Sequence, residues 1–140
     1  MGFPNERNPV TNPNKQLLQT IFEGLARGDG QPFRDSLADD FRWTLTGTTA
    51  WSRTYEGKEA VMNELMKPLF ANFATPYTNT ALRFIAEDEW VVVECQGQVT
   101  TKRGQPYNNR YCWVCRVEEG QLKEVIEYMD TQLVATALER

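Results

Sequence analysis

The sequence predicts an α+β fold in which helices cover one face of a curved, mostly antiparallel sheet. Apolar residues recur at helical spacing in the first half of the chain and alternate with polar residues in the second half. Short turn motifs separate the segments of the second half. Helices followed by a run of antiparallel strands are typical of α+β domains. A chain of 140 residues has the length of one domain with its own core.

The first residues differ in character from the rest. Residues 1–13 are polar, include Pro4, Pro9 and Pro13, and lack the apolar stretch of a signal peptide. We therefore expect residues 1–13 to form a flexible arm and residues 14–140 to form a single domain.

Three helices are expected. Pro13 is a good first helical residue with Asn12 as its cap, and the glycines at 28 and 30 end this helix. A short second helix covers about residues 31–37. The third covers about residues 58–73, where Pro68 should kink it or shorten its regular part.

The strands follow from alternation. Phe41, Trp43 and Leu45 alternate with polar residues, and residues 51–57 are expected to form a loop. From Tyr77 onward the chain is almost entirely β, with short connections that contain turn residues. The four strands expected there cover residues 78–86, 90–101, 107–117 and 121–130.

The turns allow the register to be predicted. Glu119-Gly120 as a two-residue turn places Asn109 opposite Asp130, and Arg103-Gly104 as a two-residue turn places Glu94 opposite Trp113. A three-residue turn with a bulge would shift the pairing by one residue and exchange the faces. One face is then expected to hold Val92, Glu94, Gln96, Gln98, Asn109, Tyr111, Trp113, Ile126, Tyr128 and Asp130. The other is expected to hold Val91, Val93, Cys95, Val99, Cys112, Val114, Val125, Glu127 and Met129.

Composition excludes several classes of function. The chain has no histidine, which removes the commonest general base and metal ligand. Cys112 and Cys115 lie three apart on a predicted strand and so point to opposite faces, which argues against a shared metal or disulfide. The net charge is −4 without a basic stripe, so we expect no nucleic-acid or membrane partner. We expect no metal, no cofactor and a cytoplasmic location.

Two carboxylates are the candidate catalytic groups. Asp130 ends the last strand beside aromatic residues, where it could act as a general base or simply accept hydrogen bonds from Asn109 and backbone groups. Glu94 lies mid-strand on the same predicted face, where it could act as a general acid or pair structurally with Arg53 or a tyrosine. Asn109 would bind a ligand or hold Asp130.

Aromatic side chains gather on the same predicted face and in the segment before the third helix. Residues of this kind more often belong to a core, but they could also line a pocket for a small apolar or aromatic ligand. The residues expected to bind the substrate are Asn109, Tyr111, Trp113, Tyr128, Trp43, Tyr55 and Trp51.

The second predicted face is largely aliphatic, and all three helices are needed on the first face. A second copy of the chain is the simplest cover for an apolar sheet face. We therefore expect a homodimer that forms through this outer face.

The order and spacing of several motifs resemble the NTF2-like superfamily, and more closely its SnoaL-like, ketosteroid-isomerase-related branch. The resemblance covers about residues 14–135. It rests on the segments 55–61 (YEGKEAV), 109–111 (NRY), 116–122 (RVEEGQL) and 127–130 (EYMD).

This resemblance implies a cone, in which a strongly bent sheet wraps around the N-terminal helices and opens onto a pocket. Members include ketosteroid isomerases, polyketide cyclases, epoxide hydrolases, dehydratases and modules that only bind or dimerise, so the fold alone does not give the function. By position, Asp130 resembles the general base of SnoaL-type cyclases and Asn109 its neighbour in the pocket. The chain departs from true ketosteroid isomerases, because Asp39 and Asp40 near the position of their base are more typical of a helix end.

Two hypotheses about function remain open. The first is a cofactor-free enzyme that uses carboxylate acid–base chemistry on a small, mostly apolar carbonyl compound, with an isomerase, cyclase, dehydratase or hydrolase outcome. The second is a non-catalytic module that binds a small molecule or dimerises, in which both acids are structural.

Overall fold

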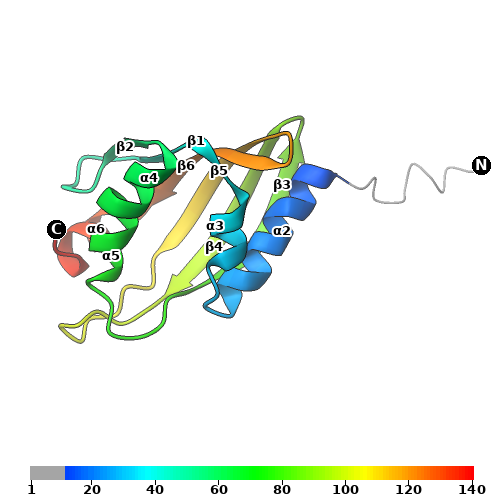
Figure 1. The fold of residues 1–140 in the computed structure, drawn as a ribbon. Helices are drawn as coiled ribbons and strands as arrows, with labels where there is room; N and C mark the ends of the chain where they lie inside the picture. The colour runs from blue at the N-terminus through cyan, green and yellow to red at the C-terminus, as the bar shows by residue number, and fades with distance from the viewer. Residues whose placement is uncertain (1–11) are drawn as a thin grey trace, which may run out of the picture.

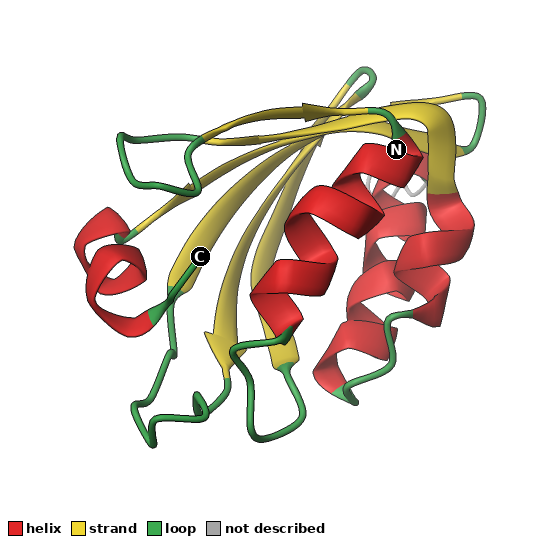
Figure 2. Ribbon diagram, turned by 60° about the vertical axis from the view of Figure 1, so that its left-hand side comes forward, coloured by secondary structure: helices red, strands yellow, loops and turns green. Residues whose placement is uncertain are grey.

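The computed structural model describes residues 12–140 and has the α+β architecture that the sequence predicts. A curved, unclosed sheet of six strands, in the order β2-β1-β6-β5-β4-β3, forms one layer. Helices lie against its concave inner face, with α6 at the end away from α2 and α3 (Figures 1 and 2). The predicted flexible arm falls outside the described residues except for Asn12 and Pro13, so it stays a prediction.

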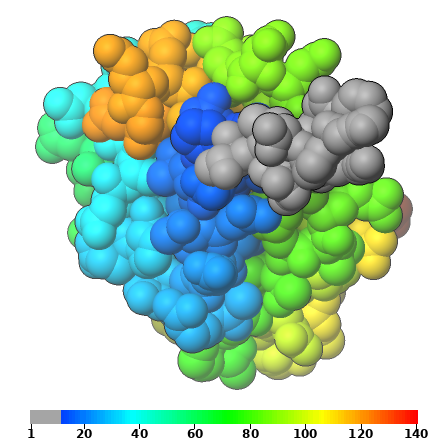
Figure 3. All heavy atoms as spheres, turned by 90° about the vertical axis from the view of Figure 1, so that its right-hand side faces the viewer, coloured from blue at the N-terminus to red at the C-terminus, as the bar shows by residue number. Residues whose placement is uncertain are grey.

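The first two helices form as expected. Helix α2 (Pro13–Ala26) starts at Pro13, and the side chain of Asn12 accepts a hydrogen bond from the backbone N–H of Lys15 at 3.0 Å. Helix α3 (Gln31–Ser36) follows after a short turn. Helix α2 occupies the middle of one face of the molecule, between α3 and β3 (Thr78–Glu87) (Figure 3). It therefore covers the inner face of the sheet at its β3 edge.

The third helix is a chain of three segments. They are α4 (Lys58–Ala60), the π-helical stretch η1 (Val61–Met66) and α5 (Lys67–Phe70), so the helix ends three residues before the predicted bound. Pro68 has no N–H to donate, and the carbonyl of Glu64 instead accepts a hydrogen bond from Arg140 at 3.2 Å. The wider π turn thus lies directly before the proline.

Two elements were not expected from the sequence. Part of the predicted loop 51–57 is a strand, β2 (Arg53–Glu56), paired with β1 (Leu37–Leu45). The chain then ends with a helix, α6 (Thr131–Ala137), in a segment for which no element was predicted. The other strands agree with the prediction to within a few residues: β4 (Trp90–Gln98), β5 (Arg110–Glu118) and β6 (Gln121–Met129).

The predicted register between β4 and β5 is wrong by one residue. Thr101 pairs with Gln105 around a three-residue turn, in which Gly104 adopts a φ of 81°. Glu94 therefore lies opposite Cys112, and not opposite Trp113. A glycine with positive φ in the last position of such a turn is the usual alternative to a two-residue hairpin.

The predicted register between β5 and β6 is correct only near the turn. Glu119 and Gly120 both have positive φ, 52° and 76°, as a two-residue turn requires, and Val117 lies opposite Leu122. A bulge then follows, so that Arg116 pairs with Glu124 and Lys123 is the extra residue. From that point onward the predicted pairing is wrong, and Trp113 lies opposite Glu127.

These two shifts exchange the faces of β4 and of most of β6 relative to β5. Trp113 and Tyr111 are buried on the inner face as expected, but Glu127 lies beside them. The residues that were expected on the outer face but lie inside are Val91, Val93, Cys95, Val99, Val125, Glu127 and Met129. The residues that were expected inside but lie on the outer face are Val92, Glu94, Gln96, Ile126 and Tyr128.

The actual outer face has two different rows of side chains. Ile85, Val92, Val114 and Ile126 form an apolar row across four strands. Arg116, Glu124 and Arg42 form ion pairs in the row nearer the β5–β6 turn, at 3.5 Å and 3.2 Å. The surface predicted for a homodimer therefore has a different composition, and the homodimer itself stays a prediction.

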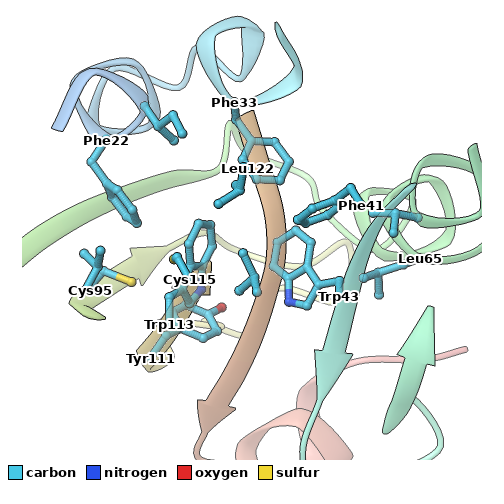
Figure 4. Packing of buried hydrophobic residues seen from close by; sticks show 14 of the residues in the cluster. Phe22, Phe33, Phe41, Trp43, Leu65, Cys95, Tyr111, Trp113, Cys115 and Leu122 are labelled. Atoms are coloured by element: carbon cyan, nitrogen blue, oxygen red, sulfur yellow. The ribbon is translucent and has the colours of Figure 1, made fainter. Parts of the chain in front are cut away.

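The inner face of the sheet and the helices enclose an aromatic core. Trp113 packs edge-on against Phe22 and Trp43, with ring centroids 5.0 Å and 5.2 Å apart, and Phe33 joins both tryptophans (Figure 4). Edge-to-face packing of this kind adds to the stabilisation from burial. Over residues 12–140, no helix is long and apolar enough to cross a membrane.

Candidate functional site

A cavity of about 260 Å³ lies between the inner face of the sheet and the helices. Its wall is mostly apolar, which is typical of small-molecule sites. Four of the predicted ligand-binding residues line it: Trp43, Trp51, Tyr111 and Trp113. Its other lining residues include Phe33, Leu45, Met62, Leu65, Met66, Leu69, Phe73, Tyr77, Tyr107, Glu127, Met129, Val134 and Leu138.

Glu127 is the buried carboxyl group in the lining of this cavity, whereas Asp29 of the same lining is exposed. It is 8% exposed, and one of its oxygens, Oε1, accepts a hydrogen bond from the indole Nε1–H of Trp113 at 2.9 Å. Burial raises the pKa of Glu127 to about 8, against the lowering effect of the bond from Trp113. The group is therefore mostly protonated at neutral pH, and it can both donate and accept a proton near that pH.

Three tyrosines lie on the same side of the cavity. Burial raises the pKa of Tyr107 to about 12 and places the pKa values of Tyr77 and Tyr111 well above the usual value, so all three phenols keep their protons. The ring of Tyr77 is partly exposed, but its hydroxyl accepts a hydrogen bond from the buried Asn79 at 3.1 Å. Three neutral phenols and a carboxyl can serve as hydrogen-bond donors to a ligand oxygen.

Asn109 does not line the cavity, but it forms hydrogen bonds with residues at the edge of the cavity. It is 1% exposed, donates to the hydroxyl of Tyr107 at 3.3 Å and bonds with both the N–H and the carbonyl of Asp130, at 3.1 Å and 3.0 Å. Asn109 therefore meets Asp130 as predicted, but through the backbone. Its predicted role in ligand binding becomes that of a positioning residue for Tyr107.

Asp130 and Glu94 do not meet in the cavity. Asp130 is exposed and caps α6, since its Oδ1 accepts from the backbone N–H groups of Gln132 and Leu133 at 3.0 Å and 3.2 Å. Glu94 lies on the outer face and forms an ion pair with Arg83. The predicted two-carboxylate pocket is thus wrong as a geometry, because the register places both groups elsewhere.

Two predicted ligand-binding aromatics also lie away from the cavity. Tyr128 is 49% exposed on the outer face. Tyr55 is buried, donates its hydroxyl to the carbonyl of Trp51 at 2.9 Å and lies under the guanidinium of Arg53. Neither lines the cavity, and Tyr55 instead fixes the loop that presents Trp51.

The C-terminal segment closes one end of the cavity. Val134 and Leu138 of this segment line the cavity wall. Asn72 bonds with both backbone groups of Glu139, at 2.8 Å and 2.9 Å, and Arg103 donates to the carbonyl of Ala137 at 3.0 Å. The wall that α6 provides is therefore tied to two other parts of the chain.

A signal for Glu127 is present in the sequence. Leu122 and Val125 are both apolar but lie three residues apart, whereas one strand face repeats every second residue. Both can point inward only if an extra residue lies between them. That bulge places Glu127 inside and Tyr128 outside.

The thiols and acids form no metal centre in the described part of the chain. Over residues 12–140, no group of three cysteine, aspartate or glutamate side chains is placed to hold a metal ion. Cys115 is buried and Cys112 is only partly so, in agreement with their predicted opposite faces, and burial raises the pKa of both thiols. The expected absence of cofactor and metal stays a prediction.

A family model described as "SnoaL-like domain" matches residues 18–125, which is most of the chain. The chain belongs to the SnoaL-like domain family. Its resemblance to the NTF2-like superfamily is thereby confirmed, and so is the cone-shaped α+β fold that the resemblance implies.

Relatives of this SnoaL-like domain include enzymes and proteins without an assigned role. The dimerizing cyclase phiC of Fungal sp. (strain ATCC 74256) is 25% identical over 142 residues. That match covers 99% of this chain, but this chain spans only 62% of the length of phiC.

Two solved structures share the fold. An NTF2-like protein of unknown function from Burkholderia pseudomallei K96243 has a TM-score of 0.78 and 22% identity, over 93% of this chain and all of that one. TerC, co-crystallised with polyporic acid, has a TM-score of 0.76 and 17% identity, over 92% of this chain and all of TerC.

Glu127 should make the SnoaL-like domain less stable as the pH rises. In the unfolded chain the carboxyl loses its proton near 4.5, whereas in the fold it keeps the proton to about 8. Unfolding free energy should therefore fall by up to about 1.4 kcal/mol per pH unit between these values, and by about 5 kcal/mol in total. Glu127→Gln cannot ionise at this position, so its unfolding free energy, measured in urea, should lack this fall with pH. Equal pH slopes for the two proteins would contradict a buried, protonated Glu127.

Asp130 should act on stability as a helix cap. Asp130→Ala should lower the unfolding free energy by about 1 kcal/mol, because two backbone N–H groups of α6 lose their acceptor. Asp130→Asn keeps a capping oxygen and should stay close to the parent protein in urea unfolding. If Asp130→Asn lowers the unfolding free energy as much as Asp130→Ala does, Asp130 does not act as the cap of α6.

Proposed function

We propose that this protein is a cofactor-free, SnoaL-like enzyme that moves a proton on a flat, largely apolar carbonyl compound, with Glu127 as the proton-transfer group. The observation that carries this proposal is one buried carboxyl with a pKa of about 8 among apolar walls and neutral phenols, whereas the charged residues Asp29 and Arg34 of the lining are exposed. A carboxylic group tuned toward neutral pH is typical of general acid–base catalysis.

The proposed step uses groups that the cavity already holds. The carboxylate form of Glu127 takes a proton from a carbon beside the carbonyl, and the electron pair of the broken C–H bond moves onto the carbonyl oxygen to give an enolate. Tyr111 or Tyr107, whose protons are held by burial, donates a hydrogen bond to that oxygen. Where a double bond is conjugated with the enolate, Glu127 returns the proton to the far carbon of that system, as in an isomerase. In a cyclase, the enolate carbon attacks a second carbonyl of the same molecule, and Glu127 gives its proton to the alkoxide that forms.

Family membership supports this chemistry, since phiC is named a cyclase. The aromatic wall of the cavity supports a flat ligand, and TerC was co-crystallised with polyporic acid. For this chain, an activity like that of these relatives is a proposal. The second candidate function is a module that binds such a molecule without turning it over; it is favoured by the presence of a single buried carboxyl in the cavity wall.

Deuterium exchange into 2-tetralone, a flat bicyclic ketone, tests the proposal without the natural substrate. The protein should accelerate exchange at the carbons beside the carbonyl, with a rate that rises with pH up to about 8, because the carboxylate form is the base. Glu127→Gln should lower the rate by about 100-fold or more. Proton NMR in D₂O gives the rate directly.

Asp130→Asn and Glu94→Gln are the matched controls, since each removes one of the carboxylates predicted from the sequence. Both should exchange at the parent rate. A loss of exchange in Asp130→Asn, with Glu127→Gln unaffected, would return the role to Asp130. Binding of 2-tetralone without any accelerated exchange would favour the binding module.

We also propose that two copies pair through the outer face of the sheet. The apolar row of Ile85, Val92, Val114 and Ile126 is continuous across four strands, and Ile85 is 58% exposed. A two-fold axis over this row would bring it against its own copy.

Light scattering should report a dimer for the parent protein and a monomer for Val114→Lys, because the new charge would be buried in the contact. Thr20→Lys, on the helical side of the molecule, is the matched control and should remain dimeric. A parent protein that is monomeric at high concentration contradicts this pairing.

A further inference from the structure

The cavity wall contains a polar group that the proposed proton transfer does not use. The indole Nε1–H of Trp43 has no hydrogen-bond partner, although the residue is only 5% exposed. A buried donor without an acceptor costs about 1–3 kcal/mol, so it needs an explanation. Trp43 lines the cavity, and an oxygen of a bound molecule would satisfy the group once the side chains that cover the nitrogen move aside.

Trp43 lies on β1, the neighbouring strand to that of Glu127, and its own partner on β6 is Val125. The sheet order puts β6 between β1 and β5, and Leu45, two residues after Trp43, pairs with Glu127. Tyr111 and Trp113 stand on the β5 side, so β6 passes between them and Trp43 (Figure 4). The nitrogen of Trp43 lies on the edge of the ring away from Phe41.

The two tryptophans are in contact but differ in the partners of their N–H groups. Their ring centroids are 5.2 Å apart, and the N–H of Trp113 is bonded to Glu127. The indole N–H from β5 is therefore bonded to the carboxyl, whereas the indole N–H from β1 has no partner. Phe33 and Phe41 pack against the ring of Trp43 and offer no acceptor through their side chains.

We propose that Trp43 is a specificity-determining residue that donates its indole N–H to an oxygen of the ligand, on the side of Glu127 opposite Tyr111. The favoured ligand class is a flat molecule with two oxygen acceptors, one for each side of the carboxyl. This inference rests on the proposed function, since it assumes that the cavity binds a small carbonyl compound. The donor raises the affinity for a doubly oxygenated ligand over the same skeleton with one oxygen.

Two neutral probes of the same skeleton test this preference. N-methylphthalimide has two carbonyls that flank one ring atom, and N-methylisoindolin-1-one has only one of them. Calorimetry should give the parent protein a preference of about 2- to 12-fold for the imide, the range that one net hydrogen bond provides. The measurements are made at pH 6, where Glu127 holds its proton.

Two variants remove the N–H in different ways. Trp43→Phe keeps an aromatic ring, and replacement of Trp43 by benzothienylalanine keeps the size of the indole but has sulfur in place of N–H. Both should bring the ratio of the two affinities close to one. The benzothienyl variant should also melt at or above the temperature of the free parent protein, because its N–H had no partner in the fold.

Phe41→Leu is the control, since Phe41 packs against Trp43 but does not line the cavity, so the change alters the packing on the indole without removing the N–H, and it should keep the preference for the imide. An unchanged preference in both Trp43 variants overturns the inference, even if Glu127→Gln has abolished exchange. A lower melting temperature of the free benzothienyl protein also overturns it, because the N–H then has a structural partner. Failure of the parent protein to bind either probe counts against both the inference and the proposed carbonyl site.

Discussion

The alternation of side chains along β6, interrupted once at Lys123, is the constraint on which the candidate site depends. A strand presents every second residue to one face, so a single extra residue exchanges the faces of everything after it. With the bulge, Leu122, Val125 and Glu127 all point inward, and the carboxyl of Glu127 meets the indole of Trp113. Without it, Glu124, Ile126 and Tyr128 would point inward in place of Val125 and Glu127.

Much of the fold could be predicted, because local patterns determine it. The cap at Asn12 and the paired positive φ angles at Glu119-Gly120 are decided by residues close together in the chain. The faces of the sheet could not be predicted in the same way, since they depend on turn length at Gly104 and on the bulge. Each of these changes a pairing by one residue, and one residue is enough to move Glu94 outside and Glu127 inside.

The sequence predicted several aromatic residues that line the cavity, but it did not predict which carboxyl lies inside it. Tyr111 and Trp113 line the cavity because β5 keeps its predicted inner face, while Trp43 reaches it from β1 and Trp51 from the loop before β2. Asp130 was misplaced for a different reason: the residues after it form a helix, and an aspartate before a helix is a cap before it is a base. Burial of the Glu127 carboxyl lowers the stability of the fold. Such a cost in stability is typical of residues that serve a function.

The parallel pairing of β1 with β6 also has a consequence for how the chain folds. Thr46 hydrogen-bonds to the carbonyl of Glu127 although the two are 81 residues apart in the sequence. Contacts of that separation require a long loop to close, and they form late in folding. The meander of β3 to β6 can assemble first from neighbouring segments, so that the bulge already holds Glu127 on one face when β1 arrives. We therefore expect β1 to dock late and to bring Trp43 with it, so that the two sides of the site meet only near the end of folding.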